Sequence, residues 1–210
     1  MKALLMLTAL ALLSAGGQAS APTATAAPTP GAPTHLSHGR FKDLTVYSPA
    51  GPATSFVLLL SGDAGWNAAA DALAAQLAQQ GAMVTGIDYR AFKAALEADG
   101  ADCVFPDGDL ENLSHFVQAY FHNTTYLAPL LVGLASGGSM AYAVLAQAPK
   151  DTFAAALSIG FCAHIAMDKP LCKGSGLELT HGARGSGLDL RPIKSLNNPW
   201  VTLQGSKGAS

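Results

Sequence analysis

Apolar runs alternate with segments of helical spacing through most of this chain. A continuous run such as SFVLLL is typical of a strand that is buried on both faces of a parallel sheet. The intervening segments place their apolar residues three or four positions apart, as in amphipathic helices. Together they predict a three-layer α/β fold with a mostly parallel sheet. The predicted strands are 45–47, 55–60, 82–88, 128–132, 153–159 and 200–204, and the predicted helices are 67–80, 89–97, 110–121 and 140–148.

Capping and turn residues mark several of these boundaries. Asn67 is a good N-cap for the first helix, and Gly81 follows that helix where a C-terminal glycine is favoured. Residues 89–97 also suit an irregular segment. Residues 99–109 and 160–198 are rich in glycine and other turn residues, and we expect both to be loops.

A cluster of small residues separates the strand at 128–132 from the helix that follows. The stretch Gly133-Leu134-Ala135-Ser136-Gly137 fits the strand, tight turn and helix of the G-x-S-x-G nucleophile elbow in α/β-hydrolases. Alanine stands at the nucleophile position, and Ala135 cannot attack a substrate. We therefore favour an elbow that has lost its chemistry. The alternative hypothesis is a slip of one residue that brings Ser136 to the tip as nucleophile.

The segment SGDAGW follows the strand at 55–60 and precedes a helix. In a hydrolase sheet this loop supplies the second N–H group of the oxyanion hole, so Gly62, Asp63 and Ala64 are candidate oxyanion or pocket residues together with Ser136. The segment also suits an ordinary strand-to-helix turn with an acidic residue near the helix N-terminus. The two interpretations are compatible.

A serine triad also needs an acid and a histidine, in that order after the nucleophile. His164 and His181 are the histidines that follow the elbow, and both precede the last predicted strand. The residues after that strand, Gly205-Ser206-Lys207-Gly208, contain no acid. We expect an incomplete α/β-hydrolase-like domain, truncated at the C-terminus.

Three cysteines allow one disulfide. Cys162 and Cys172 are close in sequence, and we predict that they form the disulfide. Cys103 then has no partner within this chain. A metal site of Cys162, His164, Cys172 and His181 is an alternative, but its spacing matches no known motif, so we predict no metal. The chain has no G-x-x-x-x-G-K-[ST] or G-x-G-x-x-G pattern, so we predict no nucleotide cofactor.

The N-terminus has the composition of an export signal. Lys2 precedes an apolar core at 3–13, and small residues follow, with plausible cleavage after Ala19 or Ala21. An uncleaved anchor is the alternative, although the apolar run is short for a bilayer. We assign 1–21 to a signal peptide, 22–40 to a Pro-, Ala- and Thr-rich linker and 41–210 to the folded domain. Export implies an oxidising compartment.

Charge excludes one class of partner. The formal net charge is −2 and 12% of the residues are charged, so the chain has no basic footprint for nucleic acid.

Several stretches together resemble one family. In order and spacing, LLLSGDAGW, GIDYRAF, DLENLSHFVQAY, LLVGLASGGSMAYAVLAQAP and TFAAALSIGFC are similar to segments of the bacterial VirJ/AcvB virulence-protein family. The resemblance covers about 56–204. It implies an α/β-hydrolase fold, a periplasmic location and links to type IV secretion and to hydrolysis of aminoacylated phosphatidylglycerol.

The chain differs from that family at the positions of the catalytic serine, acid and histidine. Family members carry serine where this chain has Ala135, and an acid and a histidine follow their last strand. Longer members hold two such domains, of which the N-terminal one is degenerate, and this chain resembles that copy. The resemblance therefore implies a non-catalytic periplasmic domain that supports a hydrolase domain or type IV secretion. The alternative is a serine-type ester hydrolase that acts on aminoacylated phosphatidylglycerol through Ser136.

The expected partners follow from this resemblance. They are an aminoacyl-phospholipid substrate or a periplasmic secretion partner. We expect no nucleic acid and, after signal cleavage, no transmembrane anchor.

Overall fold

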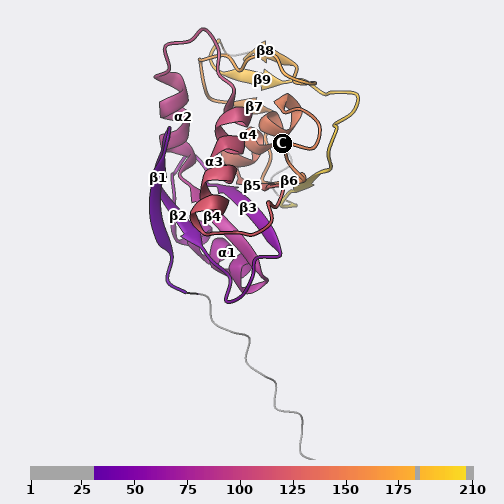
Figure 1. Cartoon of the computed structure of the whole chain (residues 1–210). Helices are drawn as coiled ribbons and strands as arrows, with labels where there is room; N and C mark the ends of the chain where they lie inside the picture. Colours follow the sequence, from indigo (N-terminus) through magenta and orange to yellow (C-terminus); the bar gives the residue numbers. More distant parts are fainter. Residues whose placement is uncertain (1–30, 183–184, 207–210) are drawn as a thin grey trace, which may run out of the picture.

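A central sheet with helices on both faces organises the chain (Figure 1). The structure is a computed structural model that describes residues 31–182 and 185–206. The expected signal peptide at 1–21 lies outside this part. The main sheet has seven strands in the order β1-β2-β4-β3-β5-β6-β10. The strands are β1 (Thr34–His38), β2 (Phe41–Tyr47), β3 (Ser55–Leu60), β4 (Ala82–Ile87), β5 (Leu130–Leu134), β6 (Ala155–Ile159) and β10 (Trp200–Leu203).

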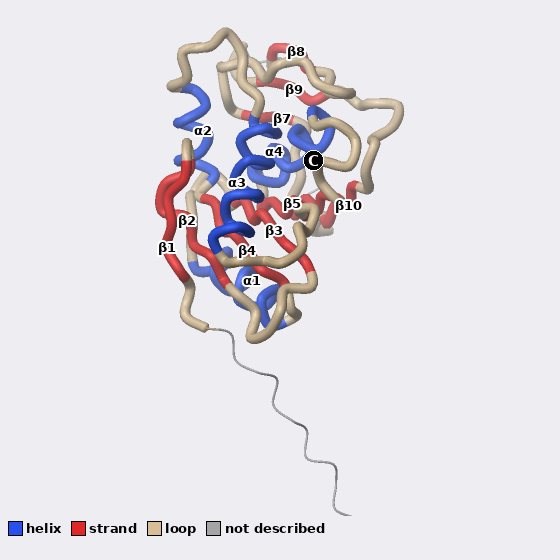
Figure 2. The backbone as a smooth tube through the Cα atoms, viewed as in Figure 1, coloured by secondary structure: helices blue, strands red, loops and turns tan. Residues whose placement is uncertain are grey.

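The five strands from β4 to β10 are parallel, and β1 and β2 add an antiparallel edge. Helix α1 (Ala68–Gln79) packs on one face, against Val57 and Val84 among others. Helices α2 (Tyr89–Glu97), α3 (Pro106–Tyr120) and α4 (Ser136–Gln147) join the larger core on the opposite face (Figure 2). The predicted three-layer α/β fold is thereby confirmed.

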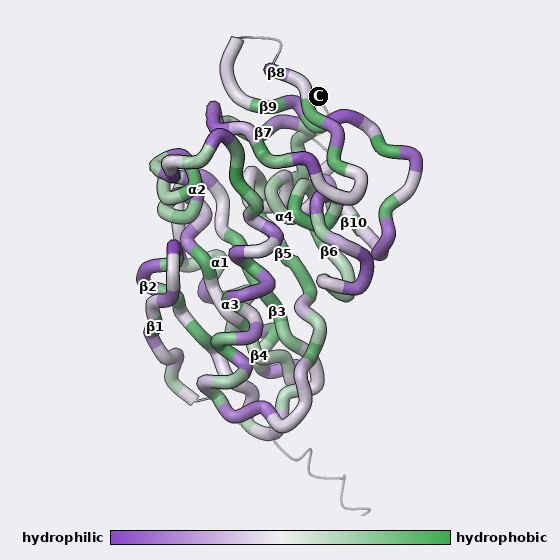
Figure 3. Tube along the Cα trace, turned by 45° about the horizontal axis from the view of Figure 1, so that its top comes forward, coloured by the Kyte–Doolittle hydropathy of each residue, from purple (hydrophilic) through white to green (hydrophobic). Residues whose placement is uncertain are grey.

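The central strands are apolar along their whole length because helices or loops cover both sides of them. Leu58 and Leu60 of β3 point into the larger core, whereas Val57 and Leu59 point towards α1. Figure 3 shows the hydrophobic colouring of β3 and β5 within the fold. Their register pairs Leu58 with Leu131, so the carboxyl ends of β3 and β5 lie side by side.

The expected linker extends too far. Residues 34–38 form β1, which pairs antiparallel with β2 through Thr34 opposite Val46 and Leu36 opposite Leu44. Leu36 packs against the core, while its strand neighbours are polar. One apolar residue in a short edge strand is too weak a pattern to distinguish it from a linker.

Two helices begin earlier than predicted. Helix α3 starts at Pro106, inside the expected loop, because proline suits the first turn of a helix and Asp107 and Asp109 favour its positive end. Helix α4 starts at Ser136 and includes the small residues of the elbow.

A small second sheet lies within the long segment that was expected to be a loop. It contains β7 (His164–Ile165), β9 (Leu188–Leu190) and β8 (Leu179–His181) in the order β7-β9-β8. Its strands are only two or three residues long, too short to give a periodic signal in the sequence. No helix in the described part of the chain is long and apolar enough to cross a membrane.

The predicted cysteine pairing is wrong. Cys172 is bonded to Cys103, with their Cα atoms 5.0 Å apart, and Cys162 is free and exposed. A bridge between Val104 and Leu171 aligns these two segments, and the Cys172 N–H donates to the Val104 carbonyl at 2.9 Å. Closeness in sequence was therefore a poor guide to the pairing, because the partner of Cys172 is 69 positions away in the chain. The pairing also removes Cys172 from the alternative metal set.

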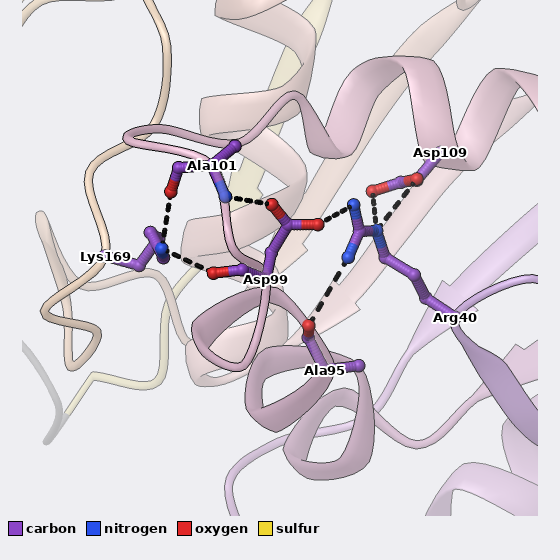
Figure 4. Close-up of polar contacts among 6 residues, drawn as sticks. All are labelled: Arg40, Ala95, Asp99, Ala101, Asp109 and Lys169. Carbon is purple, nitrogen blue, oxygen red and sulfur yellow. Dashed lines mark hydrogen bonds and ion pairs between the residues drawn. The ribbon is translucent and has the colours of Figure 1, made fainter.

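Arg40 lies in the turn between β1 and β2 and connects it to two distant segments, those of Asp99 and Asp109 (Figure 4). Its guanidinium contacts Asp99 at 2.5 Å and Asp109 at 2.9 Å. Lys169 extends the cluster by donating to the carbonyls of Asp99 and Ala101. The Ala101 N–H and the Arg40 side chain hold the pKa of Asp99 below its usual value. Burial raises the pKa of Asp109, and Arg40 opposes that shift.

We expect Arg40→Met to destabilise the protein at pH 7 more than at acid pH. Asp99 has a lowered pKa, so its contribution is present above the pKa of the unfolded chain and is lost as the pH falls through the folded value. Without Arg40, the half-buried Asp109 carboxylate also loses its cation. The melting temperature should fall by about 2–4 °C at pH 7, and this loss should shrink as the pH falls through the pKa values of the two carboxyls. Equal losses at both pH values, or the same loss in the exposed-cation control Lys42→Met, would contradict this.

Candidate functional site at the turn between β5 and α4

The turn between β5 and α4 has Ala135 at its tip. Its backbone φ is 49° and its ψ is −118°, a conformation that non-glycine residues rarely adopt. The Ala135 N–H donates to the carbonyl of Ile159 at 2.7 Å, and the Ala135 carbonyl accepts from Gly138 and Ser139. Ser136 is the first residue of α4. The structure therefore places alanine at the nucleophile position and Ser136 one residue beyond it.

Glycines permit the close contacts that this turn requires. A Cβ on Gly133 would lie 2.2 Å from the Gly137 carbonyl oxygen, and a Cβ on Gly137 would lie 2.1 Å from the Ser61 carbonyl oxygen. Both distances are far below any van der Waals contact. The glycine spacing at 133 and 137 is thus explained by the approach of α4 to β5 and to the end of β3.

The predicted oxyanion loop lies beside the elbow. An ideal Cβ on Gly62 would be 3.5 Å from the Ala135 Cβ and 3.9 Å from the Ser136 Oγ. The Gly65 N–H donates to the Gly62 carbonyl at 3.0 Å, which closes a tight turn. The first N–H groups of α4 lack acceptors within the helix. The structure thus brings Gly62, the tip and the start of α4 together, as an oxyanion hole requires.

The other two candidates of this loop are exposed. Asp63 lies with its carboxylate 4.0 Å from the Lys93 Nζ, a long and mostly solvated ion pair, and Ala64 is exposed in the same turn. The next residues fasten the loop to the sheet: the Trp66 N–H donates to the Asp88 carboxylate at 3.2 Å. Asp63 and Ala64 therefore border the site, whereas Gly62 contacts it.

The hydroxyl groups near the elbow have no base beside them. The Ser136 Oγ is buried and has no hydrogen-bond partner among the described residues. The Ser139 Oγ donates to the Cys162 carbonyl at 2.6 Å. A general base must lie within hydrogen-bond reach of the proton that it removes, and the described part of the chain places none beside Ser136.

A histidine and an aspartate do meet, but on the small sheet. His164 Nδ1 lies 2.7 Å from the Asp189 Oδ1, because β7 and β9 pair these residues directly. The sequence analysis considered His164 as a base for the elbow and as a ligand in the alternative metal set, but not together with Asp189. Nothing in the sequence indicated its partner, since the pairing depends on two very short strands.

Gly160 is a site residue that the sequence analysis missed. It follows β6 with a φ of 74°, and an ideal Cβ on it would lie 3.8 Å from the Ala135 Cα. The residue after a buried strand in a parallel sheet lies at the carboxyl edge, where sites of α/β folds form. Its position directly after the run FAAALSI was the available signal.

We expect Ala135→Gly to stabilise the protein. The strained backbone at the tip costs about 1–3 kcal/mol for a residue with a Cβ, and glycine relieves it. Against this gain, glycine makes the unfolded chain more flexible, which lowers the free energy of unfolding by about 0.5–1 kcal/mol. Urea unfolding should show a net gain of roughly 0.5–2 kcal/mol. The matched control Ala72→Gly, in the exposed part of α1, should lose about 1 kcal/mol. A loss of the same size in Ala135→Gly would contradict the strained tip.

Several solved structures are similar to this chain. A Klebsiella pneumoniae protein assigned as a dienelactone hydrolase is 19% identical, with a TM-score of 0.52, and the match covers 85% of this chain and 73% of that chain. Pyrococcus horikoshii acylaminoacyl peptidase (16% identical, TM-score 0.47) matches over 63% of this chain and 23% of its own. A carboxyl esterase from Bacillus coagulans (17%, 0.48) matches over 63% of this chain and 46% of its own. The chain thus spans about a quarter of the peptidase and under half of the esterase.

The sheet order and the strand–elbow–helix unit, together with the first of these likenesses, define an α/β-hydrolase fold. No protein-family model matches the chain, and no curated protein sequence matches it. Sequence comparison therefore assigns no family within this fold.

Proposed function

We propose that this chain is a periplasmic, VirJ/AcvB-like α/β-hydrolase-fold domain that has no nucleophile of its own. Its role is to support a catalytic hydrolase domain or a type IV secretion assembly. The observation that carries the proposal is Ala135 at the tip of an otherwise complete elbow, with its φ of 49° and its flanking glycines. A fold that keeps the architecture of the site without its reactive atom is suited to binding rather than to turnover.

Two features support the periplasmic part of the proposal. The N-terminal 21 residues have the charge and apolar pattern of an export signal. The disulfide between Cys103 and Cys172 joins segments far apart in the chain, and such bonds persist in oxidising compartments.

One observation favours the alternative, a serine-type ester hydrolase acting on aminoacylated phosphatidylglycerol. The Ser136 Oγ is buried without a partner, close to Gly62. For attack it would have to leave the helix and find a base, and the described residues supply none. We therefore keep this activity as the second candidate.

The two candidates differ in what the chain does to vesicles that contain lysyl-phosphatidylglycerol. Residues 22–210 alone should release no lysine. Added to a VirJ-family hydrolase domain with an intact serine elbow, they should raise the rate at which that domain releases lysine. The variant Ala135→Gly should raise it equally, since the supporting role uses no atom of the Ala135 side chain.

Two results would contradict the supporting role. The first is release of lysine by the chain alone that Ser136→Ala abolishes, which would establish the hydrolase. The second is an unchanged rate of the partner domain at saturating concentrations of this chain, which would contradict support of a hydrolase domain.

A further inference from the structure

A cavity of about 410 Å³ lies between α4, the start of β10 and the segment 190–196. Three aromatic side chains, those of Tyr142, Phe161 and Trp200, form one wall of it. Ile193 and Leu196 contribute aliphatic surface from the segment 190–196. The volume lies within the range of about 300–1,000 Å³ that is common for small-molecule sites.

The aromatic wall is held in place by packing and by hydrogen bonds. The ring centroids of Tyr142 and Trp200 are 4.7 Å apart. The Phe161 ring packs edge-on against both, with its centroid 5.4 Å from that of Tyr142 and 5.0 Å from that of Trp200. The Trp200 indole N–H donates to the Ser158 Oγ at 3.0 Å, and that hydroxyl donates to the Gly138 carbonyl. Because these contacts fix the rings, the wall is largely formed before a ligand arrives.

The charged residues that line the cavity are both cations. Arg191 and Lys194 line it and are exposed, and none of the described lining residues is acidic. Neither cation makes an ion pair with another residue in the described part of the chain. An apolar wall beside two cations that have no ion-pair partner among the described residues complements a ligand with an apolar body and an anionic head.

We infer that this cavity binds a single-chain alkyl carboxylate, with the chain against the three rings and the carboxylate at Arg191 and Lys194. Aromatic boxes also bind quaternary ammonium groups, but such sites gain nothing from neighbouring cations, which repel the ligand. The inference does not depend on the proposed function, because it uses no atom of the elbow. Phe161 follows Gly160, however, so one wall of the cavity begins beside the elbow tip.

The test compares three ligands with a chain of eight carbons: octanoate, octan-1-ol and octyltrimethylammonium. Trp66 and Trp200 are the two tryptophans of the chain, so the Trp66→Phe variant reports on the cavity through Trp200 fluorescence. Octanoate should change this fluorescence saturably and should bind about tenfold or more tightly than octyltrimethylammonium. A thermal melt of each variant confirms that it is folded.

Removal of the charges tests the head-group contact. The double variant Arg191→Ala/Lys194→Ala should weaken octanoate binding about tenfold and leave octan-1-ol binding unchanged, and the control Lys150→Ala should change neither. Three results would overturn the inference: no saturable binding of octanoate to folded protein, tighter binding of octyltrimethylammonium than of octanoate, or unchanged octanoate binding in the double variant.

Discussion

Gly137→Ala is expected to cost the protein most or all of its stability. The added Cβ would lie 2.1 Å from the Ser61 carbonyl oxygen and 2.8 Å from that of Leu60, and both are backbone atoms at the end of β3. Neither atom can rotate away, so α4 and β3 must separate and disturb the core between them. Overpacking usually costs about 1–3 kcal/mol, and a backbone clash of this size belongs to the exceptional losses above about 4 kcal/mol.

Urea unfolding followed by circular dichroism measures this loss. The matched control is Gly108→Ala in α3, where an added Cβ meets nothing within 4 Å. Alanine is preferred to glycine inside a helix by about 1 kcal/mol, so the control should be neutral or stabilising. A Gly137→Ala protein whose stability lies within about 1 kcal/mol of the wild type would show that α4 and β3 are not packed as described.

The double variant Cys103→Ser/Cys172→Ser is expected to lose about 2–4 kcal/mol of unfolding free energy. The bond closes a loop of 69 positions, for which the chain-entropy account gives about 4 kcal/mol, with native-state effects reducing it. The bond also ties the start of α3 to the segment before β8. Loss of the bond should therefore loosen the small sheet first, which hydrogen exchange can follow.

Reduction of the wild type should reproduce this loss, and it should not change the double variant further. Cys162→Ser is the matched control and should be close to neutral, because Cys162 is free and exposed. Peptide mapping without reduction identifies the bonded pair. A bond between Cys162 and Cys172, or a large loss in Cys162→Ser alone, would contradict the pairing.

Long periodic segments were predictable from the sequence, and short or edge segments were not. The strand at 55–60 occurs with the predicted bounds, and 82–88 ends only one residue earlier, because both are continuous apolar runs in the middle of the sheet. Strand β1 has a single apolar residue that faces the core, Leu36. The strands of the small sheet owe their existence to contacts with distant segments.

The same distinction applies to the site. The glycine spacing around Ala135 indicated the elbow because close backbone approach leaves a local signature in the sequence. The pairing of Cys103 with Cys172 and of His164 with Asp189 depends on how distant segments meet, and no local pattern records it. The oxyanion loop is intermediate: Gly62 lies beside the tip, whereas the Asp63 carboxylate lies 4.0 Å from the Lys93 Nζ.

We propose that the elbow has no working nucleophile. The most direct test is to treat residues 22–210 with a fluorophosphonate probe and to measure the intact mass, with an active serine hydrolase treated in parallel. We expect no covalent adduct, because Ala135 holds the reactive position and no base lies beside Ser136 in the described part of the chain. A stoichiometric adduct that maps to Ser136 and disappears in Ser136→Ala would contradict it.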